Sequence, residues 1–119
     1  MCQKASGQPF MAFATFDESD LRWTRGKPAV FRSSNLAERG FCKDCGTPLF
    51  FKFEGREFSM TTGSLDDPTA APPTVAFGAE SEISWCATLA TLPRIRTEDD
   101  LGPELIASFK SYQQAGGDR

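Results

Sequence analysis

The sequence predicts a mainly β fold with one C-terminal helix, and three features of the chain support this. The first two thirds consist of short apolar stretches separated by turn-forming residues, which is typical of strands. Near the C-terminus the apolar residues take up the spacing of a helix face. In addition, 11 of the 119 residues are phenylalanine, against two tryptophans and one tyrosine. Because a phenyl ring carries no polar group, most of these rings are expected in a core.

The N-terminal third contains three expected strands. Residues 9–16 (PFMAFATF) carry apolar side chains on both faces, which predicts a strand buried on both sides. A polar turn at residues 17–20 leads to a brief strand at residues 21–24. Residues 26–28 (GKP) break the chain before a third strand, Ala29–Arg32.

A hairpin is expected in the middle of the chain. Its strands are Pro48–Phe53 and residues 57–61, and Gly55 lies in the connecting loop. The elements expected after it are a turn at residues 63–68 (GSLDDP), an irregular Pro-rich loop at 70–73, and two closing strands at 74–77 and 83–88.

The expected C-terminal helix begins at Pro103, because proline suits the first position of a helix. Its apolar stripe and its end are formed by Leu105, Ile106, Phe109, Tyr112, Gly116 and Gly117. The acidic residues 98–100 precede this helix, where negative charge stabilises a helix N-terminus.

The charge balance excludes several kinds of partner. The chain has 13 basic and 16 acidic residues and a net charge of −3, with no basic patch of the kind that binds nucleic acid. No apolar run approaches the roughly 18 residues that a membrane span requires, so no membrane partner is expected. Because the N-terminus does not resemble a signal peptide, we expect a soluble, cytoplasmic protein.

The chain contains no histidine, which excludes His-based acid–base catalysis and Ser-His or Cys-His nucleophile pairs. Metal sites that depend on imidazole are excluded for the same reason. The four cysteines are Cys2, Cys42, Cys45 and Cys86. In a reduced compartment, a close pair of cysteines indicates metal or redox chemistry.

The strongest local signal is residues 41–47 (FCKDCGT). A Cys-x-x-Cys turn followed by Gly46 can direct both sulfurs at one metal ion. A thioredoxin-like redox motif is followed by a helix, whereas a strand is expected here, so zinc is the favoured interpretation. A structural zinc site needs four ligands, and Cys42 and Cys45 supply two. The alternative is an ordinary turn that binds no metal.

Several stretches together resemble one family. They are residues 1–7 (MCQKASG), 41–49 (FCKDCGTPL) and 63–68 (GSLDDP), followed by Pro73 and Trp85. In this order and spacing they are similar to the glutathione-dependent formaldehyde-activating (GFA) enzymes, which are also related to centromere protein V. The resemblance covers residues 1 to about 86.

This resemblance implies a β-tent fold, in which small antiparallel sheets meet around zinc, and two zinc sites. The family's structural site combines an early Cys-x-Cys pair with a later Cys-x-x-Cys, which Cys42 and Cys45 match. Its catalytic site uses a Cys-His-Cys segment and one further cysteine, which Cys2 matches. Cys2 is therefore implied to be the surviving ligand of the catalytic zinc.

The place of Cys2 also predicts a truncation. The family pattern reads Cys-His-Cys-x-x-Cys-Gln-Lys, and Met1 falls at the second x. We therefore expect Met1 to be an internal methionine, with the missing ligands encoded upstream. Residues 1–119 are expected to form a single GFA-type domain that lacks its N-terminal zinc-ligand segment and ends in a helical tail at residues 97–115.

The reaction that the resemblance implies is reversible carbon–sulfur bond formation between a thiol such as glutathione and formaldehyde or a related small aldehyde. The adduct is S-hydroxymethylglutathione, and zinc is the implied cofactor that holds the thiol as thiolate. Two alternatives stay open: a non-catalytic binding or scaffolding domain, and an assembly in which Cys42 and Cys45 of two chains share one zinc. The sheet edge left by the missing strands predicts a homo-oligomer.

Four further polar residues are candidates for the site. Lys4 and Ser6 follow Cys2 and are placed to contact an anionic thiol substrate, with a solvated turn as the alternative. Asp66 and Asp67 invite a general-base interpretation, but Asp-Asp-Pro after a glycine is turn chemistry, and we favour the turn.

Three residues near the end of the resemblance complete the predictions. Trp85 is expected in the core. Cys86 is expected to be a small buried thiol in a strand, not a ligand. Ala76 stands where the family often has a histidine before its late tryptophan, so any contribution of that histidine is absent from this chain.

Overall fold

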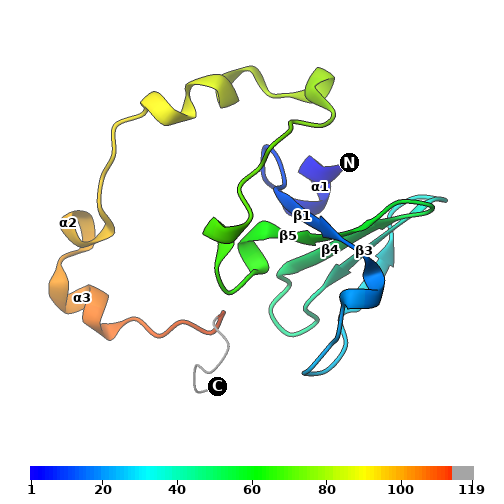
Figure 1. Ribbon diagram of the computed structural model, residues 1–119. Coiled ribbons are helices and arrows are strands. Elements are labelled where there is room, and N and C mark those ends of the chain that lie inside the picture. The colour runs from blue at the N-terminus through cyan, green and yellow to red at the C-terminus, as the bar shows by residue number, and fades with distance from the viewer. Residues whose placement is uncertain (114–119) are drawn as a thin grey trace. The chain divides into compact units, whose positions relative to one another are not determined.

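The computed structural model describes residues 1–113 of the chain (Figure 1). The chain divides into two units, residues 1–83 and residues 84–119. The expected helix end at Gly116 and Gly117 lies outside the described residues. None of the helices within residues 1–113 has the length and apolar character needed to cross a membrane.

The first unit is built on one antiparallel sheet with the strand order β1-β5-β4-β3-β2 (Figure 1). The strands are β1 (Phe13–Phe16), β2 (Ala29–Arg32), β3 (Ala37–Phe41), β4 (Pro48–Phe53) and β5 (Phe58–Thr61). Every neighbouring pair is antiparallel. The predicted mainly β fold is therefore confirmed, and the hairpin formed by β4 and β5 lies where the sequence indicates it.

One face of this sheet carries an aromatic cluster. The Phe50 and Phe58 ring centroids are 4.8 Å apart, and both side chains are more than nine-tenths buried. Trp23 packs on Phe50 with a centroid separation of 6.1 Å, and Phe16 lies 5.7 Å from Phe58. Gly40 is paired with Phe50 across β3 and β4, and the phenyl ring occupies the space that a side chain at Gly40 would need.

The opposite face is partly polar where it is most deeply buried. Ala37, Arg39, Ser59 and Thr61 all have less than a tenth of their surface exposed. They lie at alternate positions of β3 and β5, so their side chains point to the same face of the sheet. Buried polar groups are retained where they have partners or a function, so this face is a candidate for a functional site.

The rest of the first unit consists of single helical turns and loops. These are α1 (Cys2–Ser6) and the 3-10 helices η1 (Glu18–Asp20), η2 (Thr62–Ser64), η3 (Pro68–Ala70) and η4 (Ala79–Ser81). The predicted turn at residues 63–68 covers the end of η2, the joining residues 65–67 and the start of η3.

Several predicted strands differ from the structure. The strand at residues 9–16 is confined to β1, and residues 21–24 form none. The strand predicted at residues 74–77 is also wrong. This segment follows two prolines, and Val75 and Phe77 are 79% and 100% exposed; no strand within residues 1–113 pairs with it. Conversely, β3 was not predicted, because its sequence AERGF lacks the apolar alternation of a typical strand.

The second unit contains η5 (Ser84–Thr91), α2 (Thr97–Leu101) and α3 (Pro103–Ser108). The strand predicted at residues 83–88 is wrong, since this segment is a 3-10 helix. Trp85 is 50% exposed, so its predicted place in the core is wrong. Cys86 lies in the same helix and is half-buried, not in a strand.

A helix is present in the predicted tail, but it is shorter than predicted. It begins at Pro103 and ends at Ser108, so Phe109 and Tyr112 follow the helix and are about 60% exposed. The acidic residues 98–100 lie in the first turn of the separate helix α2, where their charge is favourable to that helix dipole.

Candidate functional site

The Cys-x-x-Cys segment forms the turn between β3 and β4. The Cys42 amide donates a hydrogen bond to the Thr47 carbonyl at 2.9 Å, and the Gly46 amide donates to the Cys42 carbonyl at 2.8 Å. Gly46 has a φ of 77°, which a residue with a side chain adopts only at a cost. This closed turn is followed by a strand, as the metal-knuckle interpretation requires.

Cys2 lies on α1, whose short length is stabilised by local bonds. The Ser6 hydroxyl donates to the Cys2 carbonyl at 2.9 Å and accepts a hydrogen bond from the Gln8 amide at 3.1 Å. Gly7 ends the helix with a φ of 67°. The Gln3 side-chain amide donates to the Ser81 carbonyl at 3.0 Å and ties α1 to the end of the unit. Ser6 therefore shapes the helix that carries Cys2.

Arg39, in the middle of β3, is the central residue of the site and was missed by the sequence analysis. It is only 7% exposed. Its Nη2 donates to the Cys2 Sγ at 3.3 Å, and its Nη1 donates to the Met11 Sδ at 3.7 Å. Its guanidinium carbon lies 4.5 Å from the centroid of the Phe51 ring, within the range of a cation–π contact. The contact with Cys2 joins residues 37 positions apart.

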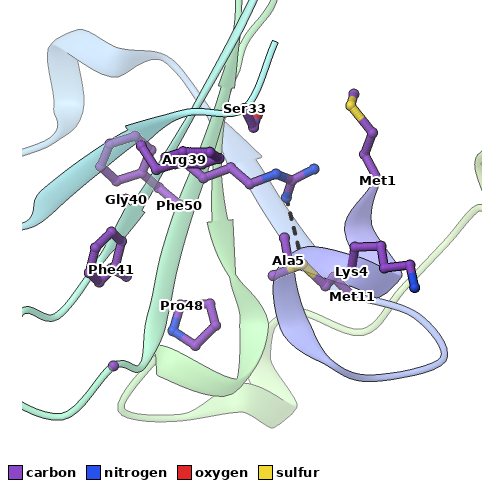
Figure 2. A pocket seen from close by; sticks show the side chains of 12 residues that line it. Met1, Lys4, Ala5, Met11, Ser33, Arg39, Gly40, Phe41, Pro48 and Phe50 are labelled. Carbon is purple, nitrogen blue, oxygen red and sulfur yellow. Dashed lines mark hydrogen bonds between the residues drawn. The ribbon is translucent and has the colours of Figure 1, made fainter.

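Arg39 and Met11 line a pocket of about 540 Å³ on the first unit (Figure 2). Figure 2 shows the Arg39 side chain extending from the sheet toward α1, and the dashed line marks its hydrogen bond to Met11. Lys4 and Phe31 also line the pocket. No aspartate or glutamate is among its lining residues. The charged side chains that line this mainly apolar pocket, Lys4 and Arg39, are therefore both positive in a chain whose net charge is −3.

The residues that the structure describes do not make a complete zinc site. Within residues 1–113, no group of three or more Cys, Asp or Glu side chains comes together as metal ligands do. Cys42 and Cys45, the predicted structural half-site, lie together in the β3–β4 turn. The Cys2 sulfur instead accepts a hydrogen bond from the positive Arg39 guanidinium.

The aspartates after β5 belong to a turn, as the sequence analysis favoured for Asp67. The Asp67 carboxylate accepts hydrogen bonds from the Thr69 hydroxyl at 2.5 Å and the Thr69 amide at 3.0 Å. These bonds lower the pKa of Asp67, the hydroxyl bond contributing most. Asp66 is exposed and does not line the pocket at Arg39.

The first unit is a small antiparallel β domain whose sheet carries a buried arginine against the cysteine of an N-terminal helix. The sequence model of one family, described as "Glutathione-dependent formaldehyde-activating enzyme", matches residues 1–81. Because this match covers more than half of the chain, the chain belongs to the GFA family, and the predicted resemblance is confirmed. Neither a curated protein nor a solved structure was found to match the chain.

Proposed function

We propose that this chain is a carbon–sulfur lyase that acts on adducts of a small thiol, such as glutathione, with formaldehyde. In the adduct-forming direction the thiol sulfur bonds to the carbonyl carbon, and the thiol proton goes to the carbonyl oxygen. The product is S-hydroxymethylglutathione, and the reverse reaction breaks the same bond. The observation that carries this proposal is that the family match at residues 1–81 contains every residue of the Arg39 pocket.

The side chains around the pocket suggest how a thiol substrate is held. Lys4 is exposed at the pocket lining, where its ammonium group attracts an anionic substrate. Ser6 contributes indirectly to substrate binding, because its hydroxyl donates a hydrogen bond within α1 and so stabilises the helix that carries Lys4. Cys2 remains our candidate for the residue at which the carbon–sulfur chemistry takes place. A reducing, cytoplasmic setting suits this chemistry because it keeps the cysteines and the substrate as thiols.

Zinc is proposed as a structural ion at the Cys42–Cys45 turn, and no step of the reaction described above is assigned to it. Since two sulfurs are half of a structural zinc site, we propose that the turns of two chains share one ion. Elemental analysis of protein purified without chelator should then give about half a zinc per chain, together with a dimeric mass by light scattering. Exchange of both cysteines for serine should remove the metal and the dimer. One zinc bound to a monomer would contradict the shared site.

The lyase activity is tested by exchange spectroscopy, because thiol and formaldehyde also combine without a catalyst. The exchange rate between glutathione and S-hydroxymethylglutathione is measured at equilibrium, with and without protein and at several zinc concentrations. Acceleration by the wild-type chain that is lost in Cys2→Ser supports the proposal. No acceleration under any of these conditions refutes it for this chain.

A binding module without catalysis is the second candidate. The pocket at Arg39 and Lys4, whose charged lining side chains are both positive, suits a role in binding an anion without catalysis. The two candidates differ in one measurement: a binding module shifts the equilibrium toward its bound adduct in proportion to protein concentration, but it leaves the exchange rate unchanged.

A further inference from the structure

We propose that Arg39 and Lys4 form a binding site for the carboxylate of a small organic ligand. This inference deepens the proposed function. Only the statement that the ligand carrying the carboxylate is a thiol rests on that function. The carboxylate site itself is argued from the burial of Arg39, its incomplete set of partners and the charge of the pocket.

The first observation is that the protein leaves Arg39 without an anionic partner. A guanidinium group has five N–H donors, and within residues 1–113 its hydrogen-bond acceptors are the Cys2 and Met11 sulfurs. Its Nε is buried and has no hydrogen-bond partner in this part of the chain. Buried charges are ordinarily paired, so a 7%-exposed arginine without a carboxylate is an unfinished ion pair.

The second observation is that the two acceptors present are easily replaced. A thioether or thiol sulfur is a weak acceptor, whereas a carboxylate matches the two parallel donors of a guanidinium group. A carboxylate that reaches Nη1 and Nη2 therefore forms stronger bonds than Met11 and Cys2 do. The Phe51 ring supports the guanidinium plane at 4.5 Å and holds these donors in place.

The third observation is that the pocket has the size and the lining for a small organic anion. Its volume of about 540 Å³ is typical of small-molecule sites. Lys4 adds a second positive charge, and Ser33 lines the same space. Phe31 pairs with Arg39 across β2 and β3 and is 64% exposed, so it offers an apolar wall beside the charge. This mixture favours an organic carboxylate over an inorganic anion.

The test is a titration of ¹⁵N-labelled full-length chain with S-methylglutathione, followed by backbone and arginine Nε–H resonances. This probe carries the carboxylates of glutathione but no free thiol, so its binding does not depend on carbon–sulfur chemistry. A negative lyase assay would therefore refute the proposed reaction, whereas a negative titration would refute the carboxylate site. The diethyl ester of the probe and inorganic phosphate serve as ligand controls.

We expect saturable shifts that include the Arg39 Nε–H resonance, and binding of the diester at least tenfold weaker. R39Q should weaken binding tenfold or more, since bonds to a charged group are lost. K4Q should weaken it about two- to fivefold, as for an exposed charge pair. The matched control is R22Q, which removes the same charge from an exposed residue outside the pocket and should bind like the wild type.

The proposal is overturned by three results: no saturable shifts with S-methylglutathione, equal affinity for the diester, or phosphate binding as tight as that of the probe. If R39Q does not fold, K4Q and the diester decide the question, because neither alters the buried part of the sheet. K4Q that behaves like R22Q would also refute the site.

Discussion

Replacing Gly40 by alanine tests the packing between β3 and β4 most directly. An added Cβ would lie 1.9 Å from Phe50 Cε1, and the ring would have to move by about 1.5 Å to reach an ordinary contact of 3.4 Å. Phe50 is held in turn by Phe58 and Trp23, so this movement disturbs the whole aromatic cluster.

Overpacking of this kind costs typically 1–3 kcal/mol, and the size of the overlap indicates about 3 kcal/mol here. For a unit of this size that free energy lowers the melting temperature by roughly 12–24 °C. The control is Gly63→Ala, because no atom lies within 4 Å of a Cβ at Gly63. We expect this control to melt within about 3 °C of its parent.

The assay is thermal unfolding followed by tryptophan fluorescence in a Trp85→Phe background. Trp23 is then the sole tryptophan and reports on the first unit, where it contacts Phe50. The double variant Gly40→Ala/Phe50→Leu should lose at least ~1 kcal/mol less unfolding free energy than the sum of the two single changes. The reason is that leucine leaves room for the Cβ added at position 40. A Gly40→Ala protein that melts like its parent, or a purely additive double variant, would refute the reasoning.

Three further predictions concern polar contacts of the first unit. Thr61→Val should lower the free energy of unfolding by about 1–2 kcal/mol in urea titrations, because the buried hydroxyl donates to the Pro48 carbonyl at 2.7 Å. Thr61→Ser keeps the hydroxyl and should retain most of this stability. Lys52→Gln should cost at most ~1 kcal/mol and nothing measurable in 1 M salt, because this exposed lysine forms a surface ion pair. The pKa of Asp67 is lowered by Thr69, so any stability from this carboxylate is present above its unfolded pKa and is lost as the pH falls through its folded pKa. Carbon NMR titration should place this pKa below the ordinary value, and Thr69→Val should raise it; an unchanged pKa would contradict the assigned cause.

Some elements of the fold could be predicted from sequence because their signals are local. The strands Ala29–Arg32 and Pro48–Phe53 have the predicted bounds, and β5 begins one residue later than expected. The turn at Cys42 and Cys45 was identified from the spacing of the cysteines and the glycine after them. Each of these features depends on a few consecutive residues, which a sequence states directly.

Other elements depend on neighbours that the local sequence does not reveal. β3 is a strand because β2 and β4 pair with it on both sides, although its residues include Glu38, Arg39 and Gly40. Residues 74–77 have strand-like composition but no partner strand, so they remain irregular. Tertiary pairing therefore overrides local propensity in both directions.

The sequence by itself determined the family, the mainly β class and the cysteine turn, because these follow from residue types at fixed spacings. Only the tertiary structure decided that Arg39 meets Cys2 and that no third ligand joins Cys42 and Cys45 within residues 1–113. The physical reason is distance along the chain. A charge on a central strand and a sulfur on the N-terminal helix become neighbours only after the sheet has formed and α1 has docked on it.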